Sequence, residues 1–460
     1  MNNKNSLQTF RVWKCHHMLL HVFGREFTTP LQSARIIFLF TSVAYNIQGF
    51  FYPIPLIDEF PDPSSVRLCR AIEYEVLLKL TLSHLITQYY KTLTPEPVYV
   101  SPTDHPLRAA EALIKQYLDA RFADGWNVED PLFSLPNADA SIKINAAQNL
   151  IAELPQPEKW TPIQNTRPLG ANWKNVRGVL PGHIRGTVLA KFYNDVYPNT
   201  AKIPLKDRAK KILDVSECLT DEQKMCAELW EGSVLTPPAI NYALLTCLVA
   251  ANNVPLAKAC KIYLMLGIGL FEASIVTWDI KYTIMEPRPI QTVRMYFPQV
   301  STSTHYGNSK GKFWCPYQKI STMTPPFPDT TSGHSCFSAV SAEIITHFFG
   351  KRIPKNIRIL SDLLPLISPI LLHNQQRNTP TFLDRFPIHK NASHISNICP
   401  RKDVLFLFQT WSDLANHAGM SRIYGGIHYH TSNTDSLYVG KLLSREIIAH
   451  FTQTLCRPHM

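Results

Sequence analysis

The stretch LAKACKIYLMLGIGLFEASIVTWDIKY, residues 256–282, decides the predicted fold of this chain. Its apolar side chains lie on nearly every face of a helix, and a helix of that kind is buried on most sides. Pro287 and Pro289 follow it closely and cannot continue a helix. The stretch therefore predicts a long core helix that other helices must cover.

Helical apolar spacing recurs on both sides of this stretch, and alternating runs typical of strands are few. Helices are predicted at about 28–52, 66–92, 221–229, 238–251, 335–349, 403–417 and 436–452. Two proline-bearing stretches, 93–106 and 154–170, are predicted to be surface loops. The predicted organisation is an N-terminal helical region with proline-rich loops, 1–220, and a C-terminal helical bundle, 221–460.

The composition is that of a large globular protein, with 45% hydrophobic and 18% charged residues over 460 positions. The net charge is +11, but the lysines and arginines are scattered, so nucleic-acid binding is not predicted. The apolar stretch 36–45 has about half of the ~20 residues that a membrane span needs, and it predicts a core helix rather than an integral span. The N-terminal residues show no clear signal peptide. We expect a soluble protein, and the sequence leaves its compartment and oligomeric state open, a homodimer included.

Two cations close the long predicted helix. Lys281 lies at its end, and Arg288 follows between two prolines that hold the backbone extended. The two side chains can therefore converge on one anion. A basic residue at a helix C-terminus is also common as a surface cation that complements the helix dipole.

Ser332, Gly333 and His334 come just before an apolar helix in PPFPDTTSGHSCFSAVSAEI. A hydroxyl, backbone N–H groups and the positive end of a helix can all point there at one oxyanion, and glycine lets the backbone come close to it. An ordinary N-cap with a solvated histidine would fit the same residues.

A third stretch, SRIYGGIHYH at 421–430, follows the helix predicted at 403–417. Arg422 carries a planar fork of donors that suits phosphate-like oxygens, and His428 can act as a nucleophile or a metal ligand. Each stretch alone is weak evidence. Together, on helix ends of one apolar helical region, they predict an oxyanion site.

The three stretches resemble the signature motifs of the superfamily shared by vanadium-dependent haloperoxidases and type 2 phosphatidic acid phosphatases: Lys281-x6-Arg288-Pro289, Ser332-Gly333-His334 and Ser421-Arg422-x5-His428. The sequence around each motif is similar to haloperoxidases in particular, in EASIVTWDIKY, TPPFPDTTSGHS and WSDLANHAGMSRIYGGIH. The resemblance is close over about 222–450. It implies an all-helical fold of two bundles with one vanadate bound in the C-terminal bundle.

The resemblance also implies roles for the motif residues. His428 would be the axial ligand of vanadium, and His334 the acid–base group that takes protons from hydrogen peroxide. Lys281 would in addition polarise the peroxide. The equatorial oxygens would be held by Lys281, Arg288, Ser332, Gly333 and Arg422. The implied reaction is oxidation of halide to hypohalous acid, which halogenates a small organic acceptor.

Two aromatic residues bear on the halide. Trp278, before Lys281, and Phe327, before His334, are similar to the apolar pocket of chloride-oxidising members of the family. The same two residues would also suit ordinary core packing, so the halide is left open.

One departure from the superfamily pattern follows the third motif. An aspartate often stands four residues after its histidine, where it orients the imidazole. This chain has Ser432 there, and along the sequence the next carboxylate is Asp435. The departure weakens the predicted affinity for vanadate.

Two other functions fit the same residues. An acid phosphatase would use His428 as the nucleophile and His334 as the acid for the leaving oxygen. Vanadate and phosphate are isosteric, so phosphate would compete for the site in either enzyme. The long gap between the two histidines and the lack of several membrane spans favour the haloperoxidase. The third reading is an inactive helical scaffold or anion-binding protein.

A short histidine group near the N-terminus is predicted to lie at the surface. Apart from Cys15, the residues His16, His17 and His21 have no cysteine or acidic residue close by in the sequence to complete a metal site.

Overall fold

The computed structural model describes residues 12–51, 60–63, 66–68, 71–90, 92–128, 156–162, 166–319, 321, 323–396 and 398–455. The predicted all-helical class is confirmed, with two short hairpins added. The main helices are α2 (Trp13–Arg25), α3 (Pro30–Asn46), α4 (Ala71–Tyr89), α5 (His105–Phe122), α6 (Gly182–Lys191), α7 (Tyr197–Ala201), α8 (Leu205–Glu217), α9 (Asp221–Leu229), α10 (Pro237–Ala251), α11 (Leu256–Ile284), α12 (Pro289–Tyr296), α13 (Gly333–Phe349), α14 (Leu364–Ile367), α15 (Leu372–Gln376), α16 (Trp411–Tyr424) and α17 (His430–Leu455).

Short 3-10 and π-helical turns connect several of these helices, at η1 (Ile47–Phe50), η5 (Trp173–Asn175), η6 (Phe192–Val196), η7 (Gly311–Phe313), η9 (Ser361–Leu363) and η10 (Pro369–Leu371). The hairpins pair β1 (Ser301–Thr304) with β2 (Gly307–Lys310), and β3 (Arg385–Ile388) with β4 (Val404–Leu407), both antiparallel.

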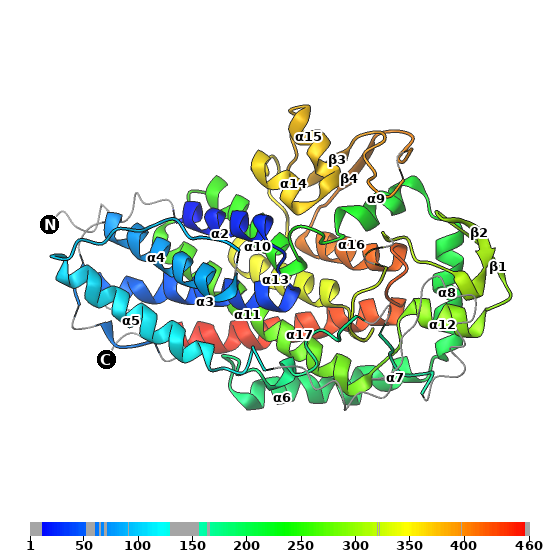
Figure 1. Cartoon of the computed structure of the whole chain (residues 1–460), viewed down its shortest axis with the longest axis horizontal. Helices are drawn as coiled ribbons and strands as arrows, with labels where there is room; N and C mark the ends of the chain where they lie inside the picture. Colours follow the sequence, from blue (N-terminus) through cyan, green and yellow to red (C-terminus); the bar gives the residue numbers. More distant parts are fainter. Residues whose placement is uncertain are drawn as a thin grey trace.

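The long apolar helix α11 forms the centre of the fold, as predicted. Helices α3, α10, α13 and α17 all pack against it (Figure 1). Gly267 allows the closest approach of α3, because a Cβ atom there would lie 3.2 Å from the Cα of Phe38. One turn further along α11, the ring of Phe271 stacks on the ring of Phe38 at 5.0 Å. Helix α3 from the predicted N-terminal region thus covers a helix of the predicted C-terminal bundle, and the division at residue 220 stays a prediction.

By length and composition, the stretch 256–296 is the one part of the described chain that could cross a membrane. Its apolar window is 94% buried inside the protein. This is the burial expected of a core helix, because helices α3, α10, α13 and α17 already cover it.

Four of the eight predicted helices have bounds close to those in the structure, whereas the predictions at 28–52 and 66–92 extend beyond α3 and α4. Helix α9 has the predicted bounds, and α10, α11 and α13 differ from prediction by one or two residues at an end. Helix α17 begins earlier than predicted, at His430 instead of Ser436. The proline-bearing stretch 93–104 is a loop, and within 154–170 the described residues are also irregular.

The helix predicted at 403–417 is wrong in its first half. Val404–Leu407 form strand β4 opposite β3, and helix α16 begins only at Trp411. Thr410 caps α16, since its side chain accepts from the backbone N–H of Asp413 while the Asp413 side chain accepts from the Thr410 N–H. The helix start is therefore set by this capping box, and the apolar run before it is left free to pair as a strand.

The surface position predicted for His16 is also wrong. His16 is fully buried, stacks on the ring of Tyr263 at 3.6 Å and bonds the hydroxyl of Tyr242. Burial lowers its pKa to about 3. His17 and His21 do reach the surface, and there they meet Asp362, an acidic partner far away in the sequence.

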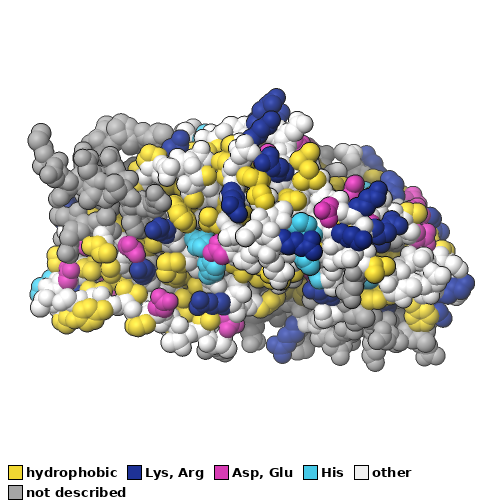
Figure 2. All heavy atoms as spheres, turned by 90° about the horizontal axis from the view of Figure 1, so that it is seen from above, with side chains coloured by type: hydrophobic (Ala, Val, Ile, Leu, Met, Phe, Trp, Pro, Cys, Tyr) yellow, Lys and Arg dark blue, Asp and Glu magenta, His cyan; other side chains and the backbone are white. Residues whose placement is uncertain are grey.

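On the face seen in Figure 2, lysine and arginine side chains are spread among acidic, apolar and uncharged ones.

Candidate functional site

The three motifs come together at the ends of five helices. Lys281 lies in the last turn of α11, and Arg288 is the N-cap of α12. Ser332 is the N-cap of α13, with Gly333 and His334 in its first turn. Arg422 lies in the last turn of α16, and His428 in the short connection to α17. Every predicted site residue is described and mostly or fully enclosed by the protein.

A cavity of about 370 Å³ opens onto this cluster. Gly333, His334, Arg422 and His428 line its inner end, and most of its walls are proline and aromatic side chains. Lys281, Arg288 and Ser332 do not line it. They contact residues that line it: Arg288 contacts Phe327 and His428, and Lys281 lies near the Phe327 ring.

Arg288 links the first and third motifs. Its Nη1 donates to the carbonyl of Ile427 at 2.7 Å and lies 3.0 Å from Nε2 of His428. Its Nε donates to the carbonyl of Phe327 at 2.8 Å. The remaining nitrogen, Nη2, is buried without a hydrogen-bond partner among the described residues. A buried guanidinium N–H costs free energy unless something accepts it, so this atom indicates a place for an oxyanion.

Lys281 is fully buried and donates from Nζ to two carbonyl oxygens, those of Pro328 at 2.9 Å and Asp329 at 2.8 Å. Burial, and then the charge of Arg288, hold its pKa well below the usual value for a lysine. The lysine thus fixes the backbone just before the second motif.

His428 has a carboxylate partner that the sequence analysis missed. Nδ1 of His428 lies 3.0 Å from Oδ1 of Asp329, a buried residue three positions before Ser332. Asp329 thus brings a carboxylate next to the imidazole, although position 432 holds a serine. The sequence does contain a hint of this in DTTSGH, where Asp329 comes shortly before the hydroxyl and N–H donors at the helix start. A buried carboxylate at such a position needs cationic partners.

Ser432 is part of the same arrangement, since its hydroxyl donates to Oδ2 of Asp329. Thr330 contacts the Ser432 hydroxyl at 3.1 Å and donates to the carboxylate of Glu286. Glu286 in turn pairs with Arg208 at 2.6 Å. Asp435, the candidate from sequence position, instead accepts from Thr200 at 2.7 Å.

The charges around His428 determine its protonation. Burial, followed by Arg288, Lys281 and Arg422, holds its pKa well below the usual value, so the ring is neutral at ordinary pH. Burial raises the pKa of Asp329, whereas the charge of Arg288 and the Ser432 hydroxyl lower it. A neutral imidazole is the form that can donate a lone pair to a metal or to phosphorus.

His334 and Arg422 share one acceptor. Nε2 of His334 lies 2.9 Å from the carbonyl oxygen of Trp230, and Nη1 of Arg422 donates to it at 3.1 Å. Burial, then the charge of Arg422, keep the pKa of His334 well below its usual value. Nε of Arg422 is buried without a hydrogen-bond partner in the described chain, the second such guanidinium nitrogen at this site.

Ser332 and Gly333 form the start of α13. The Ser332 hydroxyl accepts from the backbone N–H of Ser335 at 3.4 Å and from its hydroxyl at 2.9 Å. Gly333 lies beside the Trp278 ring, because a Cβ atom there would be 3.6 Å from it. The start of α13 is therefore well fixed by these bonds.

Trp278 and Phe327 both line the cavity, and their ring centroids are 4.9 Å apart. Nζ of Lys281 lies 5.0 Å from the Phe327 centroid, and the Arg288 guanidinium carbon lies 4.9 Å from it. The sequence prediction thus placed both rings correctly beside the site, while their role toward a halide stays a prediction.

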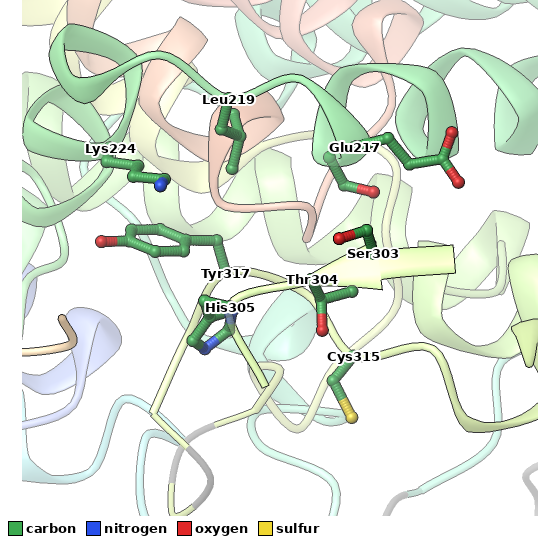
Figure 3. Close-up of a pocket in the computed structure, with 9 residues that line it drawn as sticks. Glu217, Leu219, Lys224, Ser303, Thr304, His305, Cys315 and Tyr317 are labelled. Carbon is green, nitrogen blue, oxygen red and sulfur yellow. The ribbon is translucent and has the colours of Figure 1, made fainter. Parts of the chain in front are cut away.

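A separate, smaller cavity of about 150 Å³ lies near β1, between Glu217, Lys224, His305 and Tyr317 (Figure 3). None of the motif residues lines it. The chemistry predicted from the three motifs therefore belongs to the larger cavity.

Comparison with known proteins agrees with this geometry. Residues 261–456 match the family model of the VCPO second helical-bundle domain. The fold is similar to a crystal structure described as the first bacterial vanadium-dependent iodoperoxidase, with 16% identity, a TM-score of 0.61, and 95% of this chain and 94% of that one covered.

The fold is also similar to a bacterial vanadium-dependent chloroperoxidase, in apo and holo crystal structures, each with 15% identity and a TM-score of 0.65. The match covers 93% of this chain and 96% of the apo structure, and 99% of this chain and 96% of the holo structure. No curated protein sequence matches the chain.

Proposed function

We propose that the chain, whose residues 261–456 match the family model of the VCPO second helical-bundle domain, is a vanadate-dependent haloperoxidase that oxidises a halide with hydrogen peroxide. One observation carries the proposal. Two buried guanidinium nitrogens, on Arg288 and Arg422, lack a partner in the described chain beside the neutral imidazole of His428. A tetrahedral or trigonal-bipyramidal oxyanion would accept from the first two and bind the third.

Bound vanadate would supply a Lewis-acid centre at which peroxide is activated toward halide. His428 would hold it through Nε2, with Nδ1 on the side of the Asp329 carboxylate, 3.0 Å from its Oδ1. Arg288 and Arg422 would donate to the oxyanion oxygens, together with the Gly333 N–H at the start of α13.

Lys281 and Ser332 complete the proposed cradle. Both bond to neighbouring protein groups in this structure, so their side chains would have to turn to reach a bound oxyanion. Their cationic and hydroxyl donors would offset the charge on its oxygens.

His334 would move the proton of hydrogen peroxide. Its low pKa makes it neutral and able to accept a proton, and a bound oxyanion would raise that pKa again toward the working pH. Trp278 and Phe327 would exclude water around the halide. The apolar walls of the cavity suit a small organic acceptor.

The test uses the full chain freed of vanadate and phosphate, then supplied with vanadate, hydrogen peroxide and bromide. We expect vanadate-dependent bromination of a phenolic dye and competition by inorganic phosphate. His428→Ala should abolish vanadate binding, whereas His334→Ala should keep binding and lose turnover.

Other results would assign another function. Hydrolysis of a phosphomonoester without vanadate-dependent bromination would identify a phosphatase that forms a phosphohistidine at His428. Neither activity, with vanadate or phosphate still bound, would identify an anion-binding scaffold.

A further inference from the structure

A second group of ligating side chains lies outside the motif site. His17 and His21 stand one turn apart on α2, and their imidazoles meet Asp362 from η9. Nε2 of His17 and Nε2 of His21 each lie 3.0 Å from the same carboxylate oxygen, Oδ2. All three ligand atoms lie within 4.8 Å of one another.

The contact between His17 and Asp362 does not have the angle of a good hydrogen bond. Nε2 of His17 is buried and has no hydrogen-bond partner among the described residues, even though Oδ2 of Asp362 is 3.0 Å away. A ring nitrogen this close to a carboxylate oxygen either donates a proton to it or shares a cation with it.

We propose that His17, His21 and Asp362 bind a divalent transition-metal ion, for which zinc is the best fit. Two imidazoles on successive turns of one helix face and one carboxylate are a usual zinc donor set, and protein ligands about 2.0–2.2 Å from the ion lie roughly 3 Å or more apart. Calcium and magnesium prefer oxygen ligands and fit poorly.

The fourth coordination position would be open to water. The side chains of His21 and Asp362 are 37% and 48% exposed, and His21 lines a cavity of about 500 Å³. The ion would therefore exchange with solvent and be removable by a chelator.

The place of the ion in the fold indicates a structural role. Its histidines belong to α2, near the beginning of the chain, and Asp362 belongs to the segment after α13. The two segments are already close, because a Cβ atom on Gly24 would lie 2.7 Å from Leu366. A bound ion would cross-link them and stabilise the docking of α2.

The test uses full-length protein without an affinity tag, stripped with a chelator and free of vanadate. Titration with Co²⁺ should give visible d–d absorption at one equivalent, without a thiolate charge-transfer band. Titration with Zn²⁺ should displace the cobalt and raise the Tm, and Mg²⁺ should do neither.

Two variants and a matched control locate the site. His21→Gln and Asp362→Asn should weaken metal binding by at least roughly 10- to 100-fold, the loss typical even of an outer-shell partner. Without metal, the Tm of each variant should match that of the stripped wild type. His183→Gln, at an exposed histidine of α6, should bind like the wild type.

No absorption at one equivalent of Co²⁺, or wild-type affinity in both variants, would overturn the proposal. Because vanadate is absent throughout, neither result depends on whether the chain is a haloperoxidase.

Discussion

Asp329 determines how His428 is held. Its Oδ1 lies 3.0 Å from Nδ1 of His428, and its Oδ2 accepts from Ser432. The Asp329 carboxylate thus lies between His428, the proposed ligand of vanadium, and Ser432, which replaces the usual aspartate. The missing aspartate at position 432 therefore does not leave the imidazole without a carboxylate.

Asp329→Asn should lower vanadate affinity by roughly 10- to 100-fold, as losing an outer-shell carboxylate typically does. Asp435→Asn is the matched control, because Asp435 bonds Thr200 and not the imidazole. Vanadate binding measured by calorimetry checks this. Equal affinities of the two variants would show that Asp329 does not orient His428.

His16 should make the fold sensitive to acid. Its folded pKa of about 3 lies below the ordinary 6.5, so the unfolded chain binds more protons between these values. The stability due to the neutral ring is complete above about pH 6.5 and is lost as the pH falls. Between pH 7 and 5, the free energy of unfolding should fall by about 2 kcal/mol more in the wild type than in His16→Phe.

Urea unfolding at the two pH values measures this difference. His183→Gln, at an exposed site, should show the same pH dependence as the wild type. The idea fails if His16→Phe is as sensitive to acid as the wild type.

At the residue scale, the sequence identified the motif side chains because their types and spacing are local. It missed two features that depend on contacts between distant positions. Asp329 lies 99 positions before His428, the difference between 428 and 329. Tyr263, on which His16 stacks, lies 247 positions after it, the difference between 263 and 16. Such contacts leave no periodic pattern in the sequence.

At the element scale, the turn between α16 and α17 positions His428. Gly426 has a positive φ of 68°, and a Cβ atom there would lie 2.9 Å from the Cβ of Pro316. Both the backbone conformation and the close packing therefore require glycine, while the preceding Gly425 has ordinary helical angles.

Gly426→Ala should lower the free energy of unfolding by about 1–2 kcal/mol from the left-handed backbone alone, and it should weaken vanadate binding because His428 moves. Gly186→Ala is the control, since this α6 glycine has open space around it. That change should be neutral or stabilise by up to about 1 kcal/mol. Chemical denaturation compares the two, and an unaffected Gly426→Ala would contradict the argument.

Elements were predicted well where apolar spacing and end signals agree. Thr220 and Gln223 form a capping box at the start of α9, and its predicted bounds are those observed. The helix prediction was wrong at Val404–Leu407 because a short apolar pattern fits a helix as well as a strand. Pairing with Arg385–Ile388 makes this run a strand, and that contact is not local in the sequence.

At the scale of the whole molecule, α11 joins the two predicted halves of the chain. Its face toward α3 carries Gly267 and Phe271, which contact Thr41 and Phe38. The same helix ends at Lys281, so the position of the site depends on how α11 is packed. The N-terminal helix α3 is thus part of the support for the site.

The fragment 221–460 alone should therefore lack a cooperative thermal transition and fail to bind vanadate, because removal of α3 exposes a broad apolar face of α11. Differential scanning calorimetry and vanadate titration measure both properties. Co-expression with 1–220 should restore them by covering that face again. A fragment that melts cooperatively and binds vanadate like the full chain would mean that α13 and α17 suffice to hold α11, and that the site needs nothing from the first 220 residues.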